Sequence, residues 1–305
     1  MIKRIVAVFG ANAFGQVVNV CLRLISVSIF LHYWGKTLYG EWLILLTIPS
    51  YLALSGTGIS TVAANEMAIH NSKGKEKESL GIFQSVWVFV MIISLLFFLI
   101  IVIVALAFPV HQWFQIKQTS PSQISLSLIL LALYTVFLLQ GELLVGVYRA
   151  SGIFAKGIFA NNIVSFLENI GVLVAATISH GIMMAIMVYV LIRITGTIFM
   201  ARIILKKALW FHFGFKHARI STVRSSLMPT VSFVCINVSN AFLVQGIITV
   251  IGLTLGASAV VGYAVIRTVT NLVKQLNGMI YYSICPEFST ALAVDNKKLA
   301  KKLHR

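Results

Sequence analysis

Long apolar runs separated by short polar stretches dominate this chain, and the runs are long enough to cross a membrane. A spanning helix needs about 20 mostly apolar residues. The pattern predicts about eight transmembrane helices, at Ile5–Leu31, Leu38–Ala64, Ile82–Phe108, Ile124–Tyr148, Ile158–Ile178, Ile182–Leu205, Leu227–Ile251 and Ala259–Ile284. The second contains Pro49 and the run Ser55–Gly58, so we expect it to be kinked or locally unwound.

The predicted fold is therefore an all-α integral membrane protein with one six-helix lobe and the start of a second lobe. We expect a lobe at residues 1–205, a basic cytoplasmic loop at 206–226, two helices of a second lobe at 227–290, and a basic tail at 291–305. A weak echo supports two lobes: glycines bracket a short turn at Gly35–Gly40 and again at Gly256–Gly262. Six helices separate the copies, which indicates a parallel repeat.

The composition agrees with lipid as the solvent. Hydrophobic residues make up 59% of the 305 residues and charged residues only 10%, against roughly 25% charged in a typical soluble domain. The mean hydropathy is +0.94. The excess of 24 Lys and Arg over 8 Asp and Glu would indicate nucleic acid in a soluble protein. In a membrane protein it marks cytoplasmic loops, so no nucleic-acid partner is expected.

The positive charges also predict the orientation. With the N-terminus in the cytoplasm, most Lys and Arg residues fall in cytoplasmic segments, and only Lys36 and Lys117 fall in external turns. Ile5–Leu31 is too long for a signal peptide and is interpreted as an uncleaved helix. The basic loop after Lys206 has two interpretations: it binds anionic lipid headgroups, or it is a solvated loop that fixes the topology.

Polar residues form a stripe along the first helix. They recur at spacings of three and four, which places them on one helical face: Asn12, Gln16, Asn19, Arg23 and Ser26. The eighth helix has a similar stripe with Arg267, Asn271 and Lys274. Charges inside a membrane usually face a bundle interior or an aqueous cavity. The stripes indicate either a cavity lining or polar contacts between helices, and the cations Arg23, Arg267 and Lys274 favour an anionic ligand.

Three further charged residues lie within predicted helices. Glu168 and Arg193 are almost equally distant from the short turn around His180, so a helical hairpin would bring them to the same depth. They form either a structural ion pair or, for Glu168, part of the cavity. Glu142 either takes part in proton coupling or is solvated near the cytoplasmic surface. The cysteines Cys21, Cys235 and Cys285 lie in apolar segments at no metal-site spacing, so no metal or cofactor is expected.

A familiar sequence pattern lies near the N-terminus. It consists of Tyr39-Gly40-Glu41-Trp42, Pro49-Ser50-Tyr51-Leu52, Gly58 through Glu66, and Phe83-Gln84-Ser85. The pattern resembles the N-terminal region of Wzx-type polysaccharide-biosynthesis (O-antigen) flippases of the multidrug/oligosaccharidyl-lipid/polysaccharide (MOP) exporter superfamily. The resemblance implies two six-helix lobes around a cationic cavity. Two departures are the Gly56-Thr57 pair, where the family often has an acidic residue, and a chain of about eight helices where the family has twelve to fourteen.

The resemblance implies a function in transport. It implies that the chain flips an undecaprenyl diphosphate-linked oligosaccharide across the bacterial inner membrane for O-antigen, lipopolysaccharide, capsule or exopolysaccharide synthesis. Expected partners are this lipid, the membrane lipids, a missing C-terminal half and polysaccharide-assembly proteins. The alternatives are a drug or cation exporter of the same superfamily and an inactive truncated fragment. An enzyme is not expected, because the longest predicted external loop, residues 109–123, offers few catalytic groups.

Overall fold

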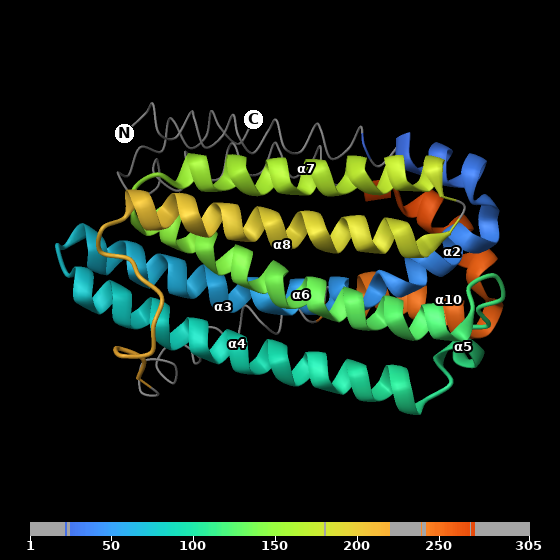
Figure 1. Ribbon diagram of the computed structural model, residues 1–305, viewed down its shortest axis with the longest axis horizontal. Helices are drawn as coiled ribbons and strands as arrows, with labels where there is room; N and C mark the ends of the chain where they lie inside the picture. Colours follow the sequence, from blue (N-terminus) through green and yellow to red (C-terminus); the bar gives the residue numbers. More distant parts are fainter. Residues whose placement is uncertain are drawn as a thin grey trace, which may run out of the picture. The chain divides into compact units, whose positions relative to one another are not determined.

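The computed structural model describes residues 22, 25–179, 181–219, 239, 242–268 and 270–271. The chain divides into two compact units, Met1–Gly262 and Tyr263–Arg305, and nearly all described residues belong to the first. Every regular element in the described part of the chain is helical (Figure 1). The prediction of an all-α fold is thus confirmed, whereas the predicted lobe boundaries stay a prediction.

The first unit is built from helices of very different lengths. They are α2 (Gly35–Leu45), α3 (Thr47–Ser72), α4 (Glu76–Ala107), α5 (Val110–Trp113), α6 (Pro121–Ala150), α7 (Phe154–Ile178), α8 (Ile182–Lys207), the π-helical turn η1 (Phe242–Gly246) and α10 (Ile247–Leu255). Residues 25–33 are also helical, and a further apolar helix, Ala257–Thr268, follows α10. Helices α4, α6, α7 and α8 are long and apolar enough to cross a membrane, so the chain is a multi-pass membrane protein.

Helix α6 lies at the centre of the first unit and packs against α3, α4, α7 and α8. Its core contacts include Leu143 and Val147, which pack with Met67 of α3 and Phe83 of α4. Helix α4 is different, because only 17% of the residues in its most apolar stretch are buried, against 56% for the corresponding stretch of α6. Residues such as Leu96, Leu99, Ile103 and Leu106 are exposed on α4, as expected for a surface in contact with lipid.

Some connections between long helices gather at one end of the first unit. The α3–α4 turn, the α6–α7 turn and the segment after α8 meet there (Figure 1), and these segments carry Lys73–Lys77, Arg149–Lys156 and Lys206–Arg219. We call this the basic end. Helices α2, α5 and α10 lie at the opposite end, here called the far end (Figure 1).

The second predicted helix, Leu38–Ala64, is wrong in its bounds. It is divided at Leu46 into α2 and α3, and α3 continues as a helix through Ser55–Gly58 to Ser72. The break precedes Pro49, which has no N–H to donate to the residue four positions earlier. The hydroxyls of Thr47 and Ser50 donate to the carbonyl oxygens of Ile44 and Leu46 at 2.7 Å and so stabilise the break.

Candidate functional site

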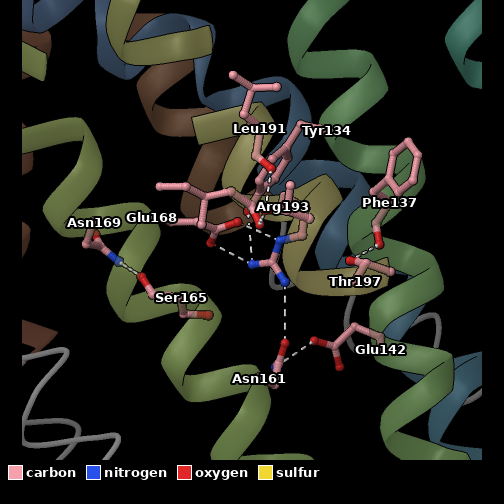
Figure 2. A network of polar contacts seen from close by, with 12 residues as sticks. Tyr134, Phe137, Glu142, Asn161, Ser165, Glu168, Asn169, Leu191, Arg193 and Thr197 are labelled. Atoms are coloured by element: carbon pink, nitrogen blue, oxygen red, sulfur yellow. Dashed lines mark hydrogen bonds and ion pairs between the residues drawn. The ribbon is translucent and has the colours of Figure 1, made fainter. Parts of the chain in front are cut away.

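Arg193 of α8 lies at the centre of a polar network buried between α6, α7 and α8 (Figure 2). Its Nε and Nη2 atoms donate to the two carboxylate oxygens of Glu168 on α7, each at 2.6 Å. Relative exposure is 2% for Glu168 and 3% for Arg193. A two-pronged contact of this kind is among the strongest hydrogen-bonded ion pairs, and burial excludes the water that would weaken it.

One side-chain amide and one hydroxyl extend the network beyond the ion pair. Nη1 of Arg193 donates to Oδ1 of Asn161 at 3.3 Å, and Nη2 donates to the hydroxyl of Tyr134 at 3.4 Å. Asn161 in turn donates from Nδ2 to Oε1 of Glu142 on α6 at 3.4 Å. A second carboxylate is therefore connected to Arg193 through one amide (Figure 2).

Stacked aromatic rings connect this network to α2. The Tyr134 ring stacks on Tyr189 with centroids 4.3 Å apart, and the guanidinium of Arg193 lies 5.4 Å from the Tyr134 centroid. Tyr189 meets Trp42 of α2 edge-on at 6.2 Å. The polar network thus contacts the aromatic side chains of the far end.

Arg193 and Glu168 neutralise each other within the bundle. Both carboxylate oxygens of Glu168 are bound to Arg193, so the pair fixes the register of α7 against α8. Of the two interpretations that the sequence left open, the structure places Glu168 in the ion pair. Glu142 is half-buried and accepts a hydrogen bond from Asn161, and both interpretations of it stay predictions.

Glu41 of α2 is a second buried carboxylate, with 0% relative exposure. Its Oε1 accepts the backbone N–H groups of Lys117 and Gln118 at 2.9 Å each. Its Oε2 accepts the N–H of Thr119 at 3.1 Å and the Thr119 hydroxyl at 2.6 Å. Four donors satisfy this charge without a cation, and they anchor the α5–α6 loop to α2.

The two glycine-bracketed segments that resemble each other in sequence contact each other, and the structure makes them helical rather than the predicted turns: residues 35–40 begin α2, and residues 257–262 lie in the helix Ala257–Thr268. Gly40 of α2 packs directly against the backbone of Ala257, so that a Cβ atom at position 40 would overlap the Ala257 carbonyl. Beside this contact, the hydroxyls of Thr37 and Ser258 are 3.4 Å apart. A further contact joins α3 to α10, where the Tyr51 hydroxyl lies 3.3 Å from the Thr249 hydroxyl. We call these contacts the turn contact.

The start of the basic loop is attached to α4. Gln84 accepts the N–H of His217 at 2.8 Å, and Ser85 accepts the N–H of Arg219 at 2.8 Å. Phe211 is buried, with its ring 4.6 Å from that of Phe83. This part of the loop is packed on the bundle, although its Lys and Arg side chains remain exposed.

Most of the predicted substrate-binding residues lie outside the described part of the chain. This is so for Asn12, Gln16, Asn19, Arg23 and Lys274. Ser26 is helical and half-buried in the first unit. Arg267 and Asn271 are helical and half-buried, and both belong to the second compact unit. Their proposed roles therefore rest on the sequence.

Several residues of the network were not identified from the sequence. Tyr134 and Tyr189 gave no signal, because a single tyrosine in an apolar run does not show which helix it packs against. Asn161 shares a helical face with Glu168, which was a usable signal. Glu41 was noted only as part of the N-terminal pattern, because its partners lie more than 70 positions away. Among the described residues, no group of three His, Cys, Asp or Glu side chains is placed to hold a metal ion.

Comparison with known proteins gives structural neighbours only. No family model and no curated protein matches the sequence. An inward-facing multidrug resistance MATE family transporter of the MOP superfamily matches 93% of this chain with a TM-score of 0.76 and 11% identity. The same fold in an outward-facing MATE transporter matches 96% of the chain with a TM-score of 0.51 and 14% identity.

A third neighbour is a MOP superfamily transporter from Pyrococcus furiosus whose reversed binding-pocket polarity suggests a different function. It matches 96% of the chain with a TM-score of 0.55 and 12% identity. The chain spans 65% of the inward-facing neighbour and 70% of the other two. The similarity extends over nearly all of this chain, which therefore has the fold of the MOP superfamily transporters.

Proposed function

We propose that this chain carries a polyprenyl diphosphate-linked oligosaccharide across the bacterial inner membrane, as a whole or as part of a transporter with two lobes. The single observation that supports transport most strongly is the fold, which is shared with transporters over 93% of the chain. The choice of an anionic, lipid-linked substrate rests on the charges inside the membrane and on the sequence resemblance.

The cations of the two polar stripes suit an anionic substrate, and the fully buried carboxylates are not available to a cationic one. An exporter of cationic drugs needs a carboxylate that is available to the cation. The two fully buried carboxylates of the described residues are both occupied, Glu168 by Arg193 and Glu41 by the α5–α6 loop. The stripes of the first and eighth helices instead supply the cations Arg23, Arg267 and Lys274. The reversed pocket polarity of the Pyrococcus furiosus transporter is a precedent for such a difference within one fold.

The expected mechanism is alternating access. The turn contact joins α2 to α10 and to Ala257 and Ser258 just after it, and these belong to different lobes in the predicted arrangement. In the predicted orientation, with the N-terminus in the cytoplasm, the far end is external. The turn contact would then be an external gate in its closed state, in agreement with the higher TM-score for the inward-facing neighbour.

The substrate would enter from the cytoplasmic side. Arg23, Arg267 and Lys274 would hold the diphosphate, because several charged donors can share its oxygens. The sugars would occupy the aqueous cavity while the polyprenyl tail stays in lipid. No covalent bond changes in this cycle, so the proposal requires no catalytic residue.

Competition between substrates tests the proposal. The chain, in its native membrane or reconstituted with any remaining half, is supplied with either an undecaprenyl diphosphate-linked oligosaccharide or a lipophilic cation such as ethidium. We expect the glycolipid to move across the bilayer and ethidium efflux to stay at background. Ethidium export without glycolipid movement would support the cation exporter, and movement of neither would support an inactive fragment.

A further inference from the structure

A groove between α7 and α8 opens near the basic end and has not been used in the proposed transport cycle. Its volume is about 740 Å³, and its lining combines a few cations with many apolar side chains. Ala160, Thr195 and Gly196 are small, which leaves room between the larger side chains on either side. Tyr148 and Val164 are buried beneath it.

The walls of the groove suit a hydrocarbon chain. Phe159, Ile163 and Leu167 of α7 are 42–50% exposed, and Ile198 and Phe199 of α8 are 41% and 61% exposed. In a membrane-spanning unit such side chains contact lipid rather than water. From Lys156 to Leu167 the α7 wall rises roughly 16 Å at 1.5 Å per residue. That length is about half of a bilayer core of about 30 Å, so the groove is as deep as one leaflet.

The mouth of the groove suits an anionic headgroup. Lys156 begins α7, whereas Arg202 and Lys207 end α8, and all three are exposed lining residues at the basic end. No Asp or Glu is among the lining residues, all of which belong to the described part of the chain. Three cations around an apolar slot complement a lipid phosphate above an acyl chain, and basic pockets between transmembrane helices typically bind anionic lipid headgroups.

We propose that the α7–α8 groove is a binding site for one anionic phospholipid of the leaflet at the basic end, with phosphatidylglycerol as its simplest ligand. Lys156, Arg202 and Lys207 hold the phosphate, and an acyl chain lies between Phe159, Ile163 and Phe199. The site is separate from the α6–α8 network and does not depend on which substrate the chain transports.

Native mass spectrometry of the purified chain, with added phosphatidylglycerol or phosphatidylcholine, tests the site. We expect one phosphatidylglycerol to stay bound at collision energies that remove phosphatidylcholine. The triple variant K156Q/R202Q/K207Q should weaken the binding of phosphatidylglycerol on the order of 100-fold, since each cation contributes about fivefold. The matched control K77Q/K206Q/K216Q changes the net charge equally at the same end but outside the groove, and should leave binding unchanged.

A second variant tests the slot itself. Thr195→Trp keeps all three cations but fills the groove, and should also release phosphatidylglycerol, whereas Met187→Trp on the exposed surface of α8 should not. Inorganic phosphate at millimolar concentration should not displace the lipid, because it cannot occupy the apolar part. Equal losses in the groove and control triple variants would overturn the proposal. So would undiminished binding in Thr195→Trp, or displacement by phosphate, because the site would then be only a charged surface.

Discussion

Arg193 and Glu168 contact each other through two hydrogen bonds of 2.6 Å between helices that face lipid on their outer sides. Two residues on consecutive helices, 25 positions apart, thus neutralise each other inside the membrane. Removal of one partner would leave the other as a buried, unpaired charge, which is far more costly than removal of both.

We expect Glu168→Gln and Arg193→Gln each to lower the stability of the chain in detergent by about 3–5 kcal/mol. The double variant should recover much of this loss. Glu142→Gln is the control, because it removes a carboxylate of the same network but leaves the pair intact. Thermal unfolding, monitored by size-exclusion chromatography, measures the stability of the two single variants, the double variant and the control. If the double variant loses as much as the two single variants together, the residues do not act as a pair.

The anchoring of the α5–α6 loop by Glu41 gives a second prediction. Glu41→Ala removes the acceptor of three N–H groups and one hydroxyl, and each unsatisfied buried donor costs about 1–3 kcal/mol. We expect the amides of residues 117–119 to exchange with deuterium much faster, with little change in α6.

Glu76→Gln serves as the control for this loop, because Glu76 is an exposed carboxylate at the start of α4. It should leave exchange in the loop unchanged. Unaltered protection of residues 117–119 in Glu41→Ala would mean that other contacts hold the loop.

Parts of this structure could be predicted from the sequence because the bilayer fixes the length of a spanning helix. The apolar runs gave α4, α6, α7 and α8, with ends that differ from the observed ones by a few residues. The Glu168–Arg193 contact followed from equal distances to one short turn. The distances along the sequence do not show how each helix is rotated about its own axis. The contacts of Tyr134 and Tyr189 were therefore not foreseen.

The break near Pro49 was expected from the sequence, but its position at Leu46 depends on local hydroxyl hydrogen bonds that the apolar pattern does not encode. Other features depend on contacts between distant segments. The glycines around residues 35–40 and 256–262 were detected as a repeat, but only the structure shows Gly40 against Ala257. The glycine at position 40 is required there because any side chain would overlap the opposing backbone.

The turn contact predicts a reversible lock. In a background with Cys21, Cys235 and Cys285 changed to Ser, Thr37→Cys and Ser258→Cys together should form a disulfide on mild oxidation, because the hydroxyls that they replace are 3.4 Å apart. Oxidation should stop transport and a reductant should restore it. Lys36→Cys with Ser258→Cys is the control pair. Full transport by the crosslinked protein would show that the turn contact does not open during the cycle.

The orientation can be measured separately. A membrane-impermeant thiol reagent added outside intact cells should label Lys36→Cys and Lys117→Cys at the far end. It should not label Lys75→Cys or Lys207→Cys at the basic end, because basic loops stay in the cytoplasm. The opposite pattern would invert the predicted topology and would make the turn contact a cytoplasmic gate.

Gly40→Val tests the same gate by steric exclusion. A side chain at position 40 would overlap the backbone of Ala257. We therefore expect the two segments to separate, and the disulfide between cysteines at positions 37 and 258 to form at least tenfold more slowly. Gly262→Val is the control, because no atom lies within 4 Å of the Cβ position there. Unchanged disulfide formation in Gly40→Val would contradict the close approach of the turns.

The most direct test of the central claim is the transbilayer movement of an undecaprenyl diphosphate-linked oligosaccharide in proteoliposomes, with the chain reconstituted alone or with any remaining half. Movement is read as the fraction of sugar that becomes accessible to an added glycosidase. We predict movement with the native chain, a loss on the order of tenfold or more in Arg23→Ala, Arg267→Ala or Lys274→Ala, and partial activity in Arg23→Lys and Arg267→Lys, because charged donors hold the diphosphate. Undiminished movement in all three Ala variants, at normal protein levels, would contradict the cationic site.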